Sequence, residues 1–197
     1  MTTESGTTEA RDTVPAEPPR RFPVVAVALL GLGIAGLLYS VVLEGQRPRP
    51  AGQGHAAPDF RLEKFGGGEV RLADLRGKTV MLDFWATWCG PCIAEFPSLK
   101  SVTDRFGKDD RVVFLSLSLD KDLKTVSEFL DKRKDHPDTI QAFLGPWSDD
   151  SVTKDYGVEA IPAIFLVGPD GKILARDLRG DDVGARLTGV LGEPKRR

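Results

Sequence analysis

The chain has 197 residues and a formal net charge of −2, from 27 basic and 29 acidic side chains. This length suits one compact domain with an additional segment, and it excludes two large domains. The charge balance excludes a basic nucleic-acid-binding surface, and the 2 cysteines exclude both a scaffold of several disulfides and a zinc site with four cysteine ligands.

Residues 1–21 are polar, are rich in threonine, glutamate and proline, and show no hydrophobic periodicity. Such a segment buries too little apolar surface to offset the entropy lost on ordering, so we predict a disordered tail. An uncharged apolar run follows over residues 22–43. As a helix, residues 23–43 would be about 32 Å long, close to the hydrocarbon thickness of a bilayer, so we predict one transmembrane anchor over residues 22–43.

The charges beside the predicted anchor indicate its orientation. Arg20 and Arg21 directly precede the apolar run, which favours a cytoplasmic tail and places residues 44 onward on the extracytoplasmic, or periplasmic, side of the membrane. A cleaved signal peptide is the alternative, but it would have a shorter apolar core and an A-x-A-like cleavage site. Residues 44–56 are rich in proline, glycine and polar side chains, so we predict a linker.

From residue 57 to residue 193 the pattern becomes that of a globular domain. Two strand-like runs within residues 61–75 flank Gly66–Gly68, which predicts a hairpin. Residues 79–86 are apolar apart from Asp83, as expected of a strand that is buried on both faces.

Apolar residues recur every three or four positions from residue 92 to residue 106, which predicts a helix that Pro97 should kink. The rest of the domain alternates strands and helices and ends in a hairpin and a helix. This order predicts an α/β fold, with a mixed sheet flanked by helices on both faces. The later strands are predicted at 111–119, 139–144, 163–167 and 172–177, and the later helices at 121–134, 148–156 and 181–191.

The two cysteines, Cys89 and Cys92, form a CxxC at the predicted junction of the buried strand and the first helix. A structural zinc site is disfavoured, because only His55 and His136 are available as further histidine ligands and His55 lies in the linker. Free backbone N–H groups at a helix start stabilise a thiolate, so the spacing favours a redox pair. We expect Cys89 to be exposed and reactive, and Cys92 to be shielded and to act as the resolving thiol.

The segment DFWATWCGPC resembles the active site of thioredoxin, and residues 57–193 are similar to membrane-tethered thiol–disulfide oxidoreductases of the TlpA/ResA type. The resemblance extends to APDF before the hairpin, to the extra helix after the central strand and to AIPAIFLVGPDG. It implies a thioredoxin-like fold with an N-terminal hairpin and a central insertion. It also implies that the peptide bond between Ile161 and Pro162 is cis and that Pro162 faces the disulfide.

Two acids are candidate proton acceptors for the buried thiol. Asp83 matches the buried aspartate of thioredoxin, and burial among apolar residues should raise its pKa. Glu95 stands where the tethered reductases carry a glutamate that lines the active-site cavity; the alternative is a solvated acid on the helix surface. Because the two acids combine features of two branches of the family, the assignment of the proton relay stays open.

Further residues are expected to contact substrate. Trp88 would offer a flat apolar surface beside the disulfide, and Ile161 and Pro162 would lie opposite. Gly90 and Pro91 form the dipeptide of reducing thioredoxins, which favours reduction over oxidation.

The leading hypothesis is a reductase of protein disulfides. The resemblance implies a role such as cytochrome c maturation, with electrons supplied by a membrane thiol carrier. The reductase needs no cofactor besides the Cys89–Cys92 pair. A peroxiredoxin-like peroxidase is the first alternative, but its PxxxTxxC pattern is absent, since the threonine nearest before Cys89 is Thr87. A tethered binding module without redox turnover is the second alternative, and the intact cysteine pair argues against it.

Overall fold

The computed structural model describes residues 29, 33–39, 52–146 and 151–195. The chain divides into two units, residues 1–47 and residues 48–197. None of the helices within the described residues is long and apolar enough to cross a membrane. The tail predicted for residues 1–21 and most of the anchor predicted for residues 22–43 lie outside the described residues, so both stay predictions.

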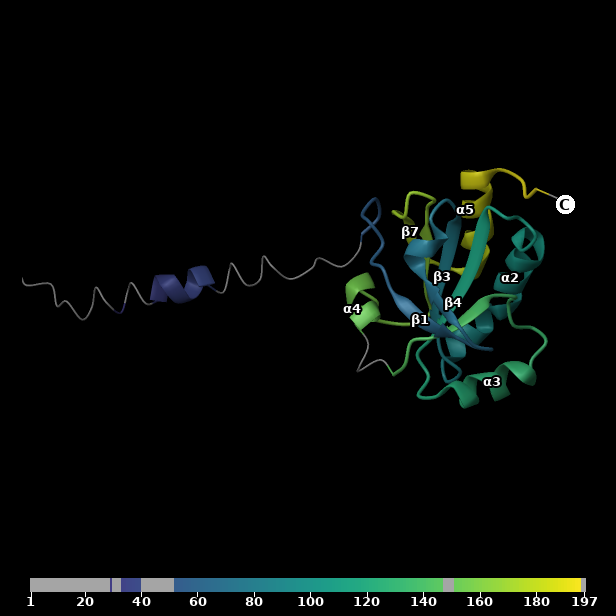
Figure 1. Cartoon of the computed structure of the whole chain (residues 1–197), viewed down its shortest axis with the longest axis horizontal. Helices are drawn as coiled ribbons and strands as arrows, with labels where there is room; N and C mark the ends of the chain where they lie inside the picture. The colour runs from purple at the N-terminus through teal and green to yellow at the C-terminus, as the bar shows by residue number, and fades with distance from the viewer. Residues whose placement is uncertain (1–28, 30–32, 40–51, 147–150, 196–197) are drawn as a thin grey trace, which may run out of the picture. The chain divides into compact units, whose positions relative to one another are not determined.

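The described residues of the second unit form a seven-stranded mixed sheet in the order β2-β1-β5-β4-β3-β6-β7 (Figure 1). Each predicted strand and helix of the domain is present, so the predicted α/β fold with a mixed sheet is confirmed. The elements are β1 (Arg61–Lys64), β2 (Glu69–Arg71), the 3-10 helix η1 (Leu72–Leu75), β3 (Thr79–Trp85), α2 (Gly90–Phe106), β4 (Val112–Ser118), α3 (Leu123–Asp131), β5 (Ile140–Phe143), α4 (Ser151–Tyr156), β6 (Ala163–Val167), β7 (Ile173–Leu178) and α5 (Gly180–Leu191).

Strand β3 is an interior strand of the sheet, between β4 and β6, and all 7 of its residues are buried. It pairs in parallel with β4, from Thr79 opposite Val112 to Trp85 opposite Ser118. It also pairs antiparallel with β6, so that Phe84 lies opposite Ala163. The continuous apolar run of this strand is therefore explained by burial on both faces, as the sequence predicted.

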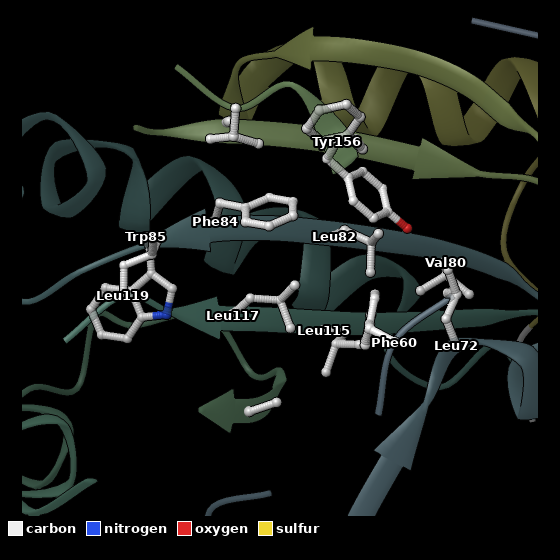
Figure 2. Packing of buried hydrophobic residues seen from close by; sticks show 14 of the residues in the cluster. Phe60, Leu72, Val80, Leu82, Phe84, Trp85, Leu115, Leu117, Leu119 and Tyr156 are labelled. Carbon is white, nitrogen blue, oxygen red and sulfur yellow. The ribbon is translucent and has the colours of Figure 1, made fainter. Parts of the chain in front are cut away.

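One face of the sheet carries an aromatic cluster. The ring of Tyr156, from α4, lies 5.5 Å from that of Phe84 and 5.2 Å from that of Phe165 between centroids. Figure 2 shows Phe84 and Tyr156 with further apolar residues of β3 and β4 around them. Such tilted and edge-on ring contacts add stability beyond the apolar area that they bury.

The other face of the sheet is covered by α2 and α5. Met81 of β3 belongs to the same apolar cluster as Leu99 and Phe106 of α2 and Leu187 of α5. The alternation of side chains along β3 therefore sends its odd-numbered positions toward these helices. Asp83 takes the same side of the strand as Met81, which places its carboxyl on the α2 side of the sheet.

The hairpin of β1 and β2 turns at Gly66–Gly68, and all three glycines have positive φ, as a tight turn of this kind requires. Strand β1 also pairs with β5, which joins the hairpin to the main sheet. The end of the segment predicted as a linker is itself hydrogen-bonded to the domain. Gly54 N–H donates to the Ile173 carbonyl at 2.8 Å, and Ala56 forms an isolated bridge with Lys172.

The boundaries of the central insertion, α3 and β5, differ from the prediction. The helix predicted for residues 121–134 begins only at Leu123, because the Asp122 side chain accepts a hydrogen bond from the Thr125 N–H at 2.8 Å and caps the helix. Pro97 lies inside α2 and the helix continues on both sides of it, while the predicted kink at Pro97 stays a prediction.

Helix α5 lies close to α2 at Gly180, the first residue of α5. A Cβ at this position would lie 2.7 Å from the Ser98 Cβ and 3.4 Å from the Glu95 carbonyl oxygen, both on α2. Gly180 is thus required for the approach of the two helices. By contrast, a Cβ at Gly189 of the same helix would meet no atom within 4 Å.

We expect Gly180→Ala to reduce the free energy of unfolding by about 1–3 kcal/mol, because the added methyl group overpacks the contact between α2 and α5. Gly189→Ala is the matched control and should stabilise the domain by about 0.5–1 kcal/mol, since alanine is the better helix former. Denaturant unfolding of both variants measures the difference. Equal effects of the two substitutions would contradict the packing explanation.

Candidate functional site

Cys89 and Cys92 are joined by a disulfide at the start of α2. Cys89 is the N-cap residue, and the Cys92 N–H donates to the Cys89 sulfur at 3.1 Å. Gly90 and Pro91 occupy the first helical positions, where the missing N–H of proline costs no helical hydrogen bond. The predicted strand-to-helix junction is confirmed, and it points free N–H groups and the positive end of the helix dipole at the Cys89 sulfur.

The expected exposure of Cys89 is wrong for the disulfide form. Cys89 is 5% exposed and Cys92 2%, so both are buried, although in the expected order. The physical reason is that Cys89 belongs to the apolar cluster that also contains Trp85 and Phe96. Trp88 is 62% exposed and presents a large apolar surface directly before Cys89.

Asp83 of β3 is 2% exposed, and its pKa is raised from 3.8 to about 7. Burial is the main cause, because it disfavours the charged form, and the nearby charge of Glu95 adds to the rise. The Ser116 hydroxyl donates to the Asp83 carboxyl at 3.4 Å and opposes the shift. The expectation of a buried acid with a raised pKa is confirmed.

The side chain of Glu95 is partly buried, and its carboxylate contacts the residues at the start of α5. The Gly180 N–H donates to Glu95 Oε2 at 3.2 Å, and Arg179 Nε lies 3.5 Å from Oε1. The pKa of Glu95 is raised overall, because the effect of burial outweighs Arg179 and the Gly180 N–H, which lower it. Glu95 is therefore not the freely solvated acid of the alternative interpretation; it is held between helices and is electrostatically coupled to Asp83.

The bond between Ile161 and Pro162 is cis, as the family resemblance implied. Pro162 directly precedes β6, whose residue Ala163 lies opposite Phe84 near the end of β3. The register therefore places Pro162, just before the start of β6, at the same end of the strands as the CxxC, which follows the end of β3. The Pro162 carbonyl accepts a hydrogen bond from Arg179 Nη1 at 3.1 Å.

Asp120 is a buried acid of the site that the sequence analysis missed. Its carboxylate accepts hydrogen bonds from the Thr87 N–H at 3.0 Å and from the Thr87 hydroxyl at 2.6 Å. The Ser118 hydroxyl donates to the same carboxylate at 2.8 Å. Asp120 thus anchors the loop that leads to Trp88 and Cys89. No local pattern in the sequence points to this link, because it depends on the parallel register that places Trp85 opposite Ser118 and so brings Thr87 beside Asp120.

Trp85 has the packing role that the sequence predicted. It is buried, its ring lies 5.4 Å from that of Phe96, and its indole N–H donates to Gln141 Oε1 at 3.2 Å. Within the described part of the chain, no three His, Cys, Asp or Glu side chains come together as a potential metal site. A disulfide at a helix start, two coupled acids on the α2 side of the sheet and an exposed tryptophan together suit thiol–disulfide exchange.

Comparisons with known proteins agree with this chemistry. The Redoxin family model matches residues 52–190. The chain is 31% identical over 154 residues to the thiol-disulfide oxidoreductase ResA of Bacillus subtilis (strain 168), covering 78% of this chain and 80% of that protein. It is 36% identical over 145 residues to the protein of the same name from Oceanobacillus iheyensis, covering 71% of each.

Solved structures of similar fold include the thioredoxin domain of a thiol-disulfide oxidoreductase from Bacteroides vulgatus. It has a TM-score of 0.65 and 28% identity, over 71% of this chain and 98% of that chain. A thiol-disulfide oxidoreductase from Bacteroides fragilis has a TM-score of 0.64 and 28% identity, over 70% of this chain and 100% of that one. These structures are similar over nearly their entire length, so the thioredoxin-like fold of the domain is shown.

The raised pKa of Asp83 predicts how the stability of the oxidised protein depends on pH. Since the folded state holds this proton up to about pH 7 and the unfolded state only up to about 3.8, stability should fall as the pH rises between these values. Asp83→Asn removes the titration. The variant should therefore gain stability relative to the wild type by up to about 4 kcal/mol across this range, with no further change above it.

Denaturant unfolding of both proteins at several pH values measures this difference. Asp104→Asn, at an exposed position on α2, is the control for loss of a surface carboxylate. A constant difference between Asp83→Asn and the wild type from pH 4 to pH 8 would contradict the assigned pKa.

Proposed function

The chain belongs to the Redoxin family and is a thioredoxin-like thiol–disulfide oxidoreductase of the TlpA/ResA type, and we propose that it reduces disulfide bonds of other proteins. The observation that carries the proposal is the Cys89–Cys92 disulfide at the start of α2, with the buried acid Asp83 on the α2 side of the sheet. The Gly90-Pro91 dipeptide between the cysteines supports the reducing direction.

In the first step the Cys89 thiolate attacks one sulfur of the substrate disulfide. A bond between Cys89 and that sulfur forms as the substrate S–S bond breaks, and the other substrate sulfur leaves as a thiolate that takes a proton from solvent. The N–H groups of the first turn of α2 stabilise the attacking thiolate. Trp88, Ile161 and Pro162 contact the substrate on either side of the sulfurs.

In the second step the Cys92 thiol gives its proton to the coupled pair of acids, with Asp83 as the main acceptor. A carboxyl with a pKa of about 7 suits this exchange, because it accepts and releases a proton near neutral pH. The Cys92 thiolate then attacks the Cys89 sulfur, the Cys89–Cys92 bond forms as the mixed disulfide breaks, and the second substrate sulfur leaves as a thiolate that takes a proton from solvent. Two electrons have passed to the substrate, and a thiol carrier in the membrane restores the dithiol without any further cofactor.

The proposal places this chemistry outside the cytoplasm, with residues 22–43 as the membrane anchor. Its support is the length of the apolar run and the arginine pair, Arg20 and Arg21, directly before it. A reductant in an oxidising compartment meets proteins whose cysteines must be kept reduced. Apocytochrome c, which needs free thiols for haem attachment, is the substrate that we propose.

We expect Cys92→Ser to accumulate mixed disulfides between Cys89 and extracytoplasmic proteins, because the resolving thiol is gone while the attacking thiol remains. The variant is expressed in its host, thiols are blocked on lysis, and partners released by reductant are identified. The double variant Cys89→Ser/Cys92→Ser is the matched control and should capture nothing. No captured protein, together with normal cytochrome maturation in Cys89→Ser, would contradict the proposal.

The reduction potential of the Cys89–Cys92 pair tests the direction of electron flow separately. A value near that of thioredoxin, about −270 mV, supports reduction, and a value near about −120 mV would reverse the assignment.

The proposed topology predicts which thiols a membrane-impermeant maleimide reaches in spheroplasts. In Cys92→Ser, Cys89 is the chain's single thiol and should react without permeabilisation once reduced. In Cys89→Ser/Cys92→Ser, a cysteine introduced by Ser5→Cys should react only after permeabilisation, because residues 1–21 are proposed to be cytoplasmic. The reverse pattern, or release of the domain into the soluble fraction, would contradict the anchored orientation.

A further inference from the structure

Arg179 contacts two segments that flank the redox site. It is the N-cap residue of α5. Its Nε lies 3.5 Å from Glu95 Oε1, and its Nη1 donates to the Pro162 carbonyl at 3.1 Å. Glu95 lies on the helix that carries the disulfide, and Pro162 directly precedes strand β6. A planar guanidinium with donors on several sides suits such a bridge, whereas a lysine offers a single point charge.

The Glu95 carboxylate is bound through both of its oxygens. Oε2 accepts from the Gly180 N–H at 3.2 Å, and Oε1 faces Arg179. Because Gly180 is fixed by its close approach to Ser98, the carboxylate is held where α5 begins. Glu95 is therefore oriented by α5 although it belongs to α2.

We propose that Arg179 is a positioning residue, which keeps Glu95 ionised beside the dithiol and joins the Pro162 segment to α2. The proposal rests on the redox function proposed above and deepens it, since it assigns a role to a residue outside the CxxC. Arg179 acts through Glu95 and Pro162 and takes no part in the exchange of sulfur bonds.

The charges around Glu95 give the direction of the effect. Burial raises the pKa of Glu95, and so do Asp181 and Asp182 of α5, whereas Arg179 and the Gly180 N–H lower it. The negative charge of Glu95 in turn raises the pKa of the buried acid Asp83 of β3. Arg179 is therefore the cationic side chain that opposes protonation of Glu95, and through Glu95 it favours the protonated form of Asp83.

A purely structural role accounts poorly for this arrangement. The Arg179 side chain is 56% exposed, and ion pairs of exposed side chains contribute little to folding stability. The loss of Arg179 should thus leave the fold intact and change the titration of Glu95.

The test is the titration of Glu95 in the oxidised full chain in detergent, followed by NMR of ¹³C-labelled glutamate carboxyl groups. The Glu95 signal is assigned by its loss in Glu95→Gln. Arg179→Gln should move the Glu95 midpoint to higher pH. Arg179→Lys should fall between Arg179→Gln and the wild type, because it keeps the charge but loses the forked geometry.

Arg186→Gln is the matched control. Arg186 is an exposed arginine of the same helix whose guanidinium donates to the Leu174 carbonyl at 3.2 Å, so its loss removes the same charge without touching Glu95. A Glu95 midpoint in Arg179→Gln that is no higher than in Arg186→Gln would overturn the proposal. Thermal unfolding checks that each variant is folded, and Arg179→Lys keeps the test available if Arg179→Gln is unstable.

A second measurement separates this proposal from the proposed function. The rate of insulin disulfide reduction is followed against pH with the reduced protein. Arg179→Gln should shift the pH profile and reduce the rate several-fold, and Arg186→Gln should do neither. If the wild type reduces no protein disulfide, the proposed function fails, whereas the NMR titration still decides the role of Arg179. An unshifted pH profile in an active Arg179→Gln would count against Arg179 as a positioning residue.

Discussion

Burial of β3 on both faces is the constraint on which the redox site depends. The strand is enclosed by an aromatic cluster on one side and by α2 and α5 on the other, so any polar side chain on it is removed from water. Asp83 is the acid that sits on this strand, and its desolvation produces its raised pKa. The C-terminal end of the same strand leads directly into the loop from which α2 begins. One buried element thus supplies the proton acceptor and sets the position of the cysteines.

The three buried or half-buried acids near the CxxC differ in the partners that compensate their charge. Asp120 receives three short hydrogen bonds from Thr87 and Ser118, and it serves to hold a loop. Glu95 receives an N–H and a guanidinium, so two groups oppose its protonation. Asp83 has one long hydrogen bond, from Ser116, at 3.4 Å. The acid with the weakest compensation is the one best suited to take up a proton.

Local patterns in the sequence predicted most of the fold and the core of the site. The strands, the helices and the CxxC at a helix start follow from periodicity and spacing, and the cis bond at Pro162 followed from the family resemblance. Contacts between distant segments were not predictable in this way. The link between Thr87 and Asp120 depends on the register of β3 and β4, and the link between Arg179 and Glu95 depends on how closely α5 approaches α2. The predicted exposure of Cys89 was wrong because the disulfide packs into the apolar cluster that contains Trp85 and Phe96, which the position at a helix start does not reveal.

The backbone bonds of residues 54–57 to the β6–β7 turn determine from which end the domain is held. Gly54 and Ala57 bond to Ile173 and Gly171, beyond the end of β6 that lies opposite Val80. The CxxC follows the other end of β3, so the length of a 7-residue strand, about 20 Å, separates the attachment from the disulfide. The anchor proposed for residues 22–43 would therefore pull on the domain at the end remote from the disulfide, and it would leave the end that carries the CxxC uncovered by the attachment itself.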